Sequence, residues 1–170
     1  ISLNQIIQIW PYKDLVDRQE RLAVAAQLDG WPPHLDQFIV NRRSDIFVPL
    51  PLSPPLQPGL YGPYFEFRSY TYASAAELPN LIAAWELALP ERLKFGPLTA
   101  LWRSEIGAEN RLLHIWPYRS LDERAAVRKK LRDAGAWPPW HVAKQRGLPG
   151  YALLHQENKI VMPAAFSPLK

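Results

Sequence analysis

The sequence predicts an α+β protein that contains two copies of one folding unit, and three observations support this prediction. A block that begins at Asn4 returns without a gap at Asn110, 106 residues later. Strand-like and helix-like patterns alternate along the chain, and a proline-rich segment closes each copy. The period is much longer than the 20 to 50 residues typical of solenoids and propellers, so each copy is expected to be a complete folding unit.

The repeated block shares 10 of 31 aligned positions between residues 4–34 and 110–140. The shared positions are an Asn, an Ile-Trp-Pro-Tyr block, the pairs Leu15/Leu121 and Arg18/Arg124, and a Trp-Pro-Pro triplet at residues 31–33 and 137–139. The second copy has about 47 residues ahead of this block, whereas the first has almost none. Half of a β-hairpin unit cannot cover its own apolar face, so we expect residues upstream of Ile1 to complete the first copy.

The first half of the complete copy predicts a strand followed by an amphipathic helix. Residues 64–72 are rich in aromatic side chains and alternate with polar ones, which indicates a strand. The Ser74-to-Glu77 spacing is that of a capping box, and apolar residues then recur at helical intervals from Leu78 to Leu89. Pro90 is expected to end or kink this helix.

The second half of this copy predicts two strands, a second helix and a final strand. The strands are expected at residues 98–105 and 111–116, and Ser120 to Glu123 cap a helix that Gly135 and Pro138 stop. A short strand at residues 160–162 precedes the proline-rich exit. The order β-α-β-β-α-β is that of a ferredoxin-like unit, an antiparallel sheet with both helices on one face.

Strand alternation divides the sheet residues into an apolar set and a polar-aromatic set. The apolar set is expected to pack on the helices: it contains Phe65, Phe67, Leu113 and Ile115. The opposite set is expected to lie on the free face: it contains Glu66, Arg68, Tyr70, Tyr72, Leu112, His114 and Trp116. The first copy supplies Gln8 and Trp10 at the positions of His114 and Trp116. If the free faces of the two copies meet, the sheets enclose a barrel with the helices outside.

These patterns predict three segments in the chain. Residues 1–49 form the C-terminal half of a first ferredoxin-like domain, and residues 64–170 form a complete second domain. Residues 50–63 form a linker, because their prolines remove backbone donors and restrain the preceding residues.

The composition excludes several classes of function. The chain has no cysteine, which excludes thiol catalysis and Cys-ligated metals, and its four histidines show no metal-ligand spacing. No membrane span is expected, because no run approaches 18 apolar residues. The net charge of +4 raises nucleic-acid binding as a possibility, but the densest basic cluster, residues 128–132, reads more simply as a solvated helix face. We expect no cofactor, and we expect the cytoplasm as the compartment, or the mitochondrion if the source is eukaryotic.

The chain resembles the NIPSNAP family of the dimeric α/β-barrel group. The resemblance rests on the strand motif Phe65-Glu66-Phe67-Arg68-Ser69-Tyr70 and on the pattern that runs from Ile106 through Asn110, His114, Trp116 and Tyr118 to Arg124. It implies the barrel fold and no settled chemistry, since the wider group includes cofactor-free monooxygenases, isomerases and haem enzymes.

The candidate site residues each have a functional and a structural interpretation. His114 is the candidate general base, or a hydrogen-bonded histidine that fills the interior. Arg68 oriented by Glu66 contacts an anionic or carbonyl ligand, or the two form an ion pair within the sheet. Tyr70, Trp10 and Trp116 form the walls of an apolar pocket, or pack as filler. The ligand-binding candidates are Glu66, Arg68, Tyr70, His114, Trp116, Gln8 and Trp10.

Three hypotheses of function follow. The first is a binding protein whose barrel holds a small apolar or aromatic ligand with a carbonyl or anionic group. The second is a cofactor-free oxygenase or isomerase that uses His114 as its base. The third is a scaffold that binds partner proteins through the proline-rich linker, and a homo-oligomer is compatible with all three.

Overall fold

The computed structural model describes residues 4–31, 33 and 35–170 and separates the chain into two compact units. The first unit ends at Arg43, and the second runs from Ser44 to Lys170. Among the described helices, none combines the length and the apolar character that crossing a membrane would need.

The first unit contains one α-helix, α1 (Leu15–Ala25), and a short 3-10 helix, η1 (Asp36–Phe38). The Asp14 side chain caps α1 by accepting a hydrogen bond of 2.8 Å from the backbone N–H of Asp17. Residues 5–12 form no strand, and no other described segment of this unit is a strand that could pair with them. The strand alternation that was expected to place Gln8 and Trp10 is therefore absent. The Trp10 ring instead meets Trp31 edge-on, with centroids 6.0 Å apart.

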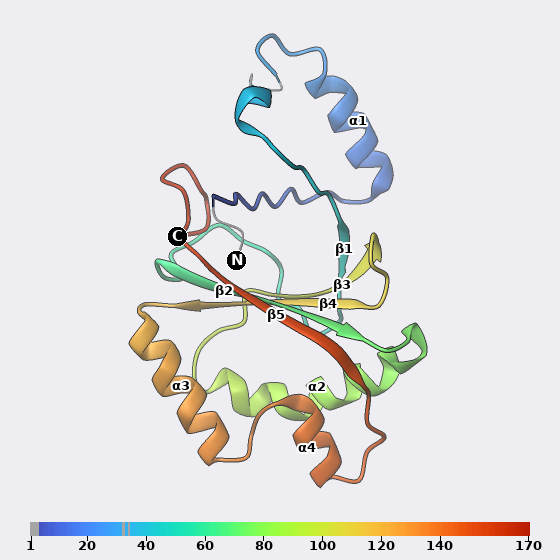
Figure 1. Cartoon of the computed structure of the whole chain (residues 1–170), viewed down its shortest axis with the longest axis vertical. Helices are drawn as coiled ribbons and strands as arrows, with labels where there is room; N and C mark the ends of the chain where they lie inside the picture. The colour runs from blue at the N-terminus through green and yellow to red at the C-terminus, as the bar shows by residue number, and fades with distance from the viewer. Residues whose placement is uncertain (1–3, 32, 34) are drawn as a thin grey trace. The chain divides into compact units, whose positions relative to one another are not determined.

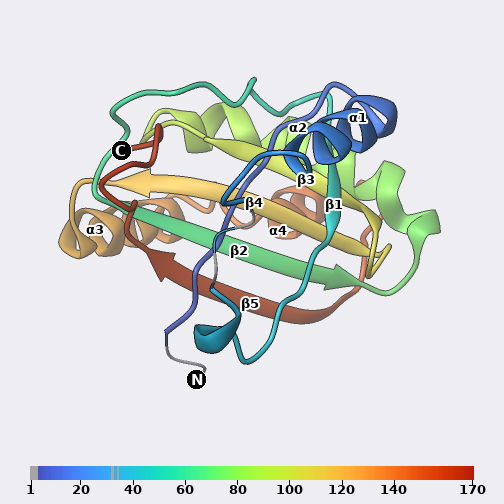
Figure 2. The same cartoon turned by 90° about the horizontal axis from the view of Figure 1, so that it is seen from above.

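The second unit is built on one antiparallel five-stranded sheet. The strands are β1 (Ile46–Pro49), β2 (Tyr64–Tyr72), β3 (Ala100–Ile106), β4 (Arg111–Tyr118) and β5 (Leu153–Val161). Their order across the sheet is β1-β3-β4-β2-β5, which Figure 2 shows from above. Strands β2 to β5 and their connecting helices reproduce the expected β-α-β-β-α-β order, which confirms the ferredoxin-like α+β fold. The closed barrel stays a prediction, because the described residues form a single sheet.

Strand β1 belongs to the first copy by sequence and to the second unit by structure. It aligns in the repeat with the end of β5, yet it pairs antiparallel with β3 at the opposite edge of the sheet. The compact units therefore divide at residues 43 and 44, a few residues before the repeat ends.

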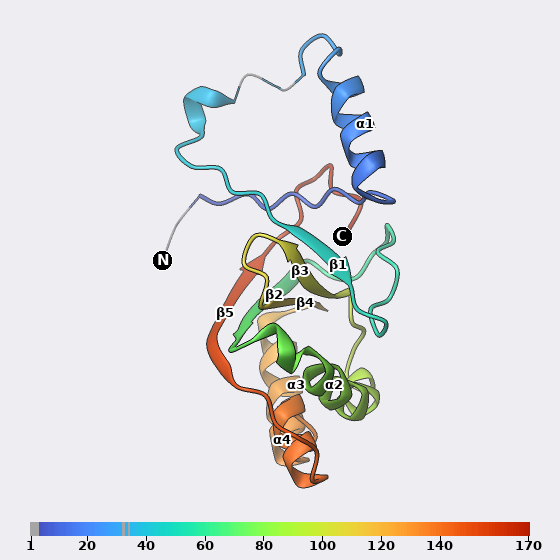
Figure 3. The same ribbon diagram turned by 90° about the vertical axis from the view of Figure 1, so that its right-hand side faces the viewer.

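Three helices cover one face of the sheet, as Figures 1 and 3 show. They are α2 (Leu78–Leu93), which the 3-10 helix η2 (Ala75–Glu77) precedes, α3 (Leu121–Asp133) and α4 (Pro139–Gln145). Ser120 caps α3 by accepting a hydrogen bond of 3.0 Å from the backbone N–H of Glu123. Gly135, at φ 61°, closes its C-terminus in the left-handed conformation that glycine adopts without strain.

Several element boundaries differ from the predictions. Helix α2 continues through Pro90 to Leu93, because its buried face packs against the sheet and outweighs the loss of one backbone hydrogen bond. Helix α4 was not predicted: Pro138 was interpreted as a stop, but it is the N-cap residue and Pro139 opens the helix, a position that favours proline. Strand β5 is nine residues long, whereas only three were predicted. The prediction was too short because the polar sequence of this edge strand lacks the alternation of apolar residues that indicates a strand.

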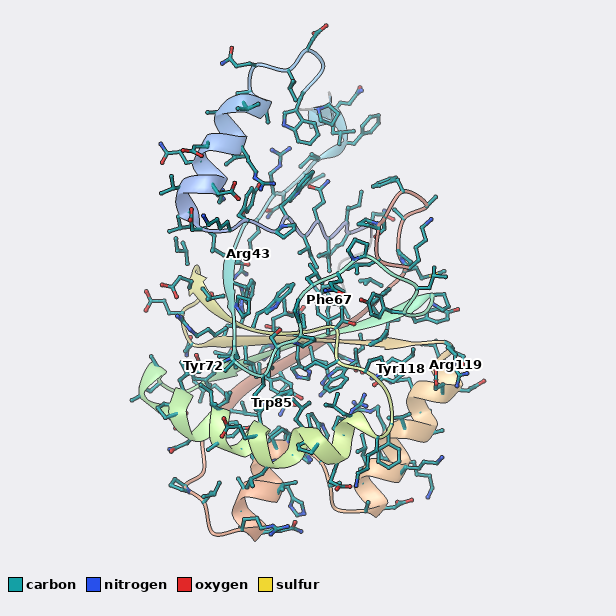
Figure 4. The ribbon with its side chains drawn as sticks, turned by 180° about the vertical axis from the view of Figure 1, so that it is seen from behind. Arg43, Phe67, Tyr72, Trp85, Tyr118 and Arg119 are labelled. Atoms are coloured by element: carbon teal, nitrogen blue, oxygen red, sulfur yellow. The ribbon has the colours of Figure 1, made fainter. Side chains whose placement is uncertain are left out.

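The predicted assignment of the two sheet faces is wrong. The polar-aromatic set faces the helices: Tyr70, Tyr72, Leu112 and Trp116 share one core cluster with Trp85 of α2. Phe65 and Ile115 are buried outside that cluster, and Figure 4 shows Phe67 on the opposite side of the sheet from Trp85. The physical reason is that hydrogen bonds within the first set offset part of the cost of burying it beneath the helices: Glu66 accepts from Arg68, and His114 accepts from Trp116.

Candidate functional site

A cavity of about 210 Å³ lies between the sheet and the helices of the second unit. Strands β2, β4 and β5 provide one wall, and helices α2, α3 and α4, with the turn before α4, provide the other. The lining residues are Glu66, Arg68, Tyr70, Arg92, Trp116, Tyr118, Arg128, Leu131, Arg132, Trp137, Pro138, Trp140 and Gln156. Aromatic rings and arginines therefore dominate the lining.

Glu66 on β2 is the one carboxylate that lines this cavity, and it is fully buried. Its Oε1 accepts hydrogen bonds from Arg68 at 3.0 Å, from Arg124 at 2.5 Å and from Asn158 at 3.2 Å. Arg128 approaches the same oxygen at 3.8 Å. The other oxygen, Oε2, has no hydrogen-bond partner among the described residues. One carboxylate oxygen thus organises three guanidinium groups, while the second can still accept a hydrogen bond.

The arginines determine the protonation of Glu66. Burial alone raises the pKa of this carboxyl group, but the hydrogen bond from Arg124 and the charges of Arg68 and Arg124 outweigh burial. The pKa of Glu66 therefore lies below its ordinary value of 4.5, and the group is ionised at neutral pH.

Arg92 on α2 is buried and has no acidic partner among the described residues. Only 3% of the residue is exposed. One guanidinium nitrogen donates to the Tyr118 hydroxyl at 3.0 Å, and the guanidinium carbon lies 3.8 Å from the centroid of the Trp116 ring. The Nη1 nitrogen has no hydrogen-bond partner among the described residues. A buried donor of this kind costs free energy unless a ligand or an ordered water accepts from it.

His114 lies behind the cavity rather than in its wall. The residue is fully buried, its Nδ1 accepts a hydrogen bond of 2.6 Å from the Trp116 indole, and its ring meets Trp85 and Tyr70 edge-on at 4.8 Å. Burial, with smaller contributions from the charges of Arg68 and Arg92, lowers the pKa of His114 well below 6.5. The imidazole is therefore neutral at neutral pH.

Residues of the repeated block form much of the cavity. Trp116, Tyr118, Trp137 and Pro138 line it, and Arg124 binds Glu66 beside it. The rings of Trp116 and Trp137 meet edge-on with centroids 5.9 Å apart, which closely matches the equivalent pair Trp10 and Trp31 in the first unit. Two residues of the Trp-Pro-Pro triplet, Trp137 and Pro138, thus form part of the cavity wall.

The structure brings together four of the predicted site residues. Glu66, Arg68, Tyr70 and Trp116 line one cavity, although on the helix side of the sheet. His114 contacts two of them from behind, through hydrogen-bond and ring contacts. Gln8 and Trp10 belong to the first unit.

Sequence reasoning missed Arg92, Tyr118, Arg128 and Trp137 as lining residues. Two signals could have identified three of these four residues, Arg92, Tyr118 and Trp137. Arg92 continues the helical spacing of the buried residues Trp85 and Leu89, which places it on the buried face of α2. Tyr118 and Trp137 are identical between the two copies.

Comparisons with known proteins agree with this architecture. The NIPSNAP family model matches residues 2–54 and 65–168. Protein NipSnap homolog 3A from Homo sapiens is 28% identical over 184 residues, which cover 99% of this chain and 68% of that protein. Protein NipSnap homolog 3B from Homo sapiens is 29% identical, with 98% and 67% covered.

Solved structures show the same relationship. The crystal structure of Atu4242 from Agrobacterium tumefaciens, which is described as a NIPSNAP family protein with unknown function, is 35% identical. It superposes with a TM-score of 0.52 and covers 63% of this chain and 99% of its own. An uncharacterised NIPSNAP domain protein from Burkholderia xenovorans is 30% identical, with a TM-score of 0.51, and covers 62% of this chain and 98% of its own. The chain belongs to the NIPSNAP family.

Proposed function

We propose that the chain binds a small aromatic or apolar ligand with an anionic group in the cavity between the sheet and the helices. The observation that carries the proposal is Arg92, a buried guanidinium that lines a cavity walled by tryptophan and tyrosine and has one nitrogen without a hydrogen-bond partner among the described residues. Aromatic walls favour a flat ligand, and the arginine favours an anionic group on it. This proposal moves the predicted pocket from the barrel interior to the helix side of the sheet.

The size of the cavity limits the ligand. Its volume of about 210 Å³ lies below the 300 to 1,000 Å³ typical of sites for drug-sized molecules. A ligand with a single ring and one anionic group matches this volume. Benzoate is therefore a suitable first probe, and benzyl alcohol is its uncharged counterpart.

A pair of matched substitutions on α3 tests the location. Leu131 lines the cavity and is 3% exposed, whereas Leu121 lies on the same helix and is 52% exposed. Leu131→Phe fills part of the cavity, so we expect it to weaken benzoate binding by about tenfold or more, a difference of about 1.4 kcal/mol. Leu121→Phe makes the same chemical change outside the cavity and is expected to bind as the parent does.

Isothermal titration calorimetry at pH 7.5 measures both variants, and circular dichroism checks that each is folded. If the parent binds neither benzoate nor any other single-ring anion, the proposed function is wrong. If Leu131→Phe binds benzoate as tightly as Leu121→Phe does, the ligand occupies another site.

The contacts of His114 do not favour the alternative of an enzyme that uses it as a base. The imidazole does not line the cavity, and its Nδ1 already accepts a hydrogen bond from Trp116. We propose instead that His114 supports the Trp116 wall. The scaffold hypothesis for the linker, the homo-oligomer and the cytoplasmic compartment stay predictions, the last supported by a cysteine-free composition that suits a reducing environment.

A further inference from the structure

The cavity carries an excess of positive charge. Four arginines line it (Arg68, Arg92, Arg128 and Arg132), and Glu66 is the single acidic residue in the lining. Arg132 is exposed, so solvent screens its charge. The other three are buried or partly buried, where charges interact more strongly than at the surface.

Glu66 cannot neutralise this set. Its carboxylate already shares one negative charge between Arg68 and Arg124, which lie at 3.0 and 2.5 Å. Arg128 reaches it only at 3.8 Å, and the described residues place no carboxylate within ion-pair distance of Arg92. The pKa of Arg128 is lowered from its ordinary value, first by burial and then by repulsion from the charge of Arg68. Arg92 and Arg128 are therefore left without a close counterion among the described residues.

We infer that the natural ligand is a one-ring aromatic molecule with a dianionic head group, of which a phosphomonoester is the commonest kind. The inference rests on the proposed function and adds the charge of the ligand to it. The head group lies on Arg92 and Arg128, because these two buried or partly buried lining arginines make no hydrogen bond to Glu66 among the described residues. The ring lies against the tryptophan walls, and guanidinium groups bind phosphate oxygens through paired hydrogen bonds.

Four probe molecules distinguish the effect of ligand charge on affinity from the effect of ligand shape. Phenyl phosphate and benzenesulfonate share a ring and a tetrahedral head, but at pH 7.5 the first carries nearly two negative charges and the second carries one. Benzoate is a planar monoanion, and inorganic phosphate lacks the ring. We expect phenyl phosphate to bind at least about tenfold more tightly than benzenesulfonate and benzoate, and inorganic phosphate to bind more weakly than phenyl phosphate.

The pH dependence provides a second readout. The second pKa of a phosphomonoester is about 6, so at pH 5 only about a tenth of phenyl phosphate is dianionic. Its affinity is expected to fall several-fold between pH 7.5 and pH 5, while that of benzenesulfonate stays constant. The arginines remain charged over this range, as guanidinium groups do in proteins.

Two variants on α3 test whether Arg128 contacts the dianionic head group. Arg128→Gln removes a cation from the lining, and its side chain is 38% exposed, so the protein is expected to fold. Lys130→Gln is the matched control, because it makes the same charge change at an exposed position of α3 outside the lining. We expect Arg128→Gln to reduce the preference for phenyl phosphate over benzenesulfonate several-fold, and Lys130→Gln to leave it unchanged. Arg92→Lys, which keeps the charge but loses the planar fork, is expected to retain part of the preference.

Each outcome decides one claim. Equal binding of phenyl phosphate and benzenesulfonate overturns the dianion inference and leaves the proposed function intact. Inorganic phosphate that binds as tightly as phenyl phosphate also overturns it, because the ring then contributes nothing. If Arg128→Gln keeps the preference for phenyl phosphate over benzenesulfonate, the head group does not lie on Arg128. The same conclusion follows if Lys130→Gln reduces this preference as much as Arg128→Gln does. The absence of binding by every ring-bearing anion refutes the proposed function itself.

Discussion

The substitution Glu66→Gln tests whether the buried ion cluster of Glu66, Arg68 and Arg124 stabilises the second unit. Gln keeps the size of the side chain but removes the charge that Arg68 and Arg124 share at 3.0 and 2.5 Å. Removing one partner of a buried pair typically costs 3 to 5 kcal/mol, because the remaining charges stay buried without compensation. The Arg124 and Arg128 side chains are 22% and 38% exposed, so solvent relieves part of this cost. We therefore expect a loss of about 3 kcal/mol, at the lower end of that range.

Urea unfolding followed by tryptophan fluorescence measures the effect. For a protein of this size, about 3 kcal/mol corresponds to a decrease in Tm of roughly 6 to 12 °C. The pH dependence identifies the cause. The pKa of Glu66 is lower in the folded state than the ordinary 4.5, so the stability from its charge is fully present above pH 4.5 and is lost as the pH falls below it. The difference between the parent and Glu66→Gln is therefore expected to narrow on acidification from pH 7 to pH 3.

Glu105→Gln is the matched control. Glu105 also lies two residues from an arginine on a strand, and it pairs with Arg103 at 2.5 Å, but the two side chains are 43% and 34% exposed. An exposed pair contributes about 1 kcal/mol or less. If Glu66→Gln costs no more than Glu105→Gln, or if its cost is the same at pH 3 as at pH 7, the cluster does not stabilise the unit by charge.

Two further predictions concern the surroundings of the cavity. His114 is buried in the neutral form with a pKa well below 6.5, so the stability that this burial confers is present above pH 6.5 and declines below it, by at most about 1.4 kcal/mol per pH unit. In urea unfolding at pH 7.5, 6 and 5, His114→Gln is expected to flatten this decline, and parallel curves for the two proteins would contradict the assignment. Gly62, at φ 141°, lies where a Cβ would be 2.6 Å from the carbonyl oxygen of Tyr118, whereas Gly147, at φ 69°, has nothing within 4 Å of such a Cβ. We expect Gly62→Ala to cost at least about 2 kcal/mol and Gly147→Ala about 1 kcal/mol in the same assay, and equal losses would show that backbone strain alone matters.

The sequence predicted the local elements well, because their signals are local. The strand at residues 64–72 was predicted at its observed bounds, and Ser120 caps α3 as its spacing indicated, whereas Ser74 caps the short 3-10 helix η2 and not α2. The extent of α2 past Pro90 was not predictable, because tertiary packing overrides the proline. Strand β5 was underestimated, since an edge strand needs no apolar alternation to pair on one side.

Four of the predicted candidates line the cavity, Glu66, Arg68, Tyr70 and Trp116, but they lie on the helix side of the sheet and not on its free face. The expectation that apolar residues face the helices did not account for the hydrogen bonds that form within the polar set. Glu66 with its arginines and His114 with Trp116 are hydrogen-bonded pairs, so they pack under helices as apolar side chains do. The alternation along a strand defines two sets of side chains but does not show which set faces the helices. That choice depends on pairing between residues that are far apart in the sequence.

The two edge-on tryptophan pairs separate two properties of the proposed ligand site, its ring geometry and its charge. Trp10 with Trp31 and Trp116 with Trp137 keep nearly the same spacing, 6.0 and 5.9 Å, although one unit has a sheet and the other has no strand among its described residues. The cations differ: the positions of Arg128 and Arg132 are occupied in the first copy by Leu22 and Ala26. Duplication thus retained the aromatic frame while the charges on the neighbouring helix diverged. The positive charge that lines the cavity is therefore adjustable by substitutions on one helix, while the geometry of the tryptophan rings is kept.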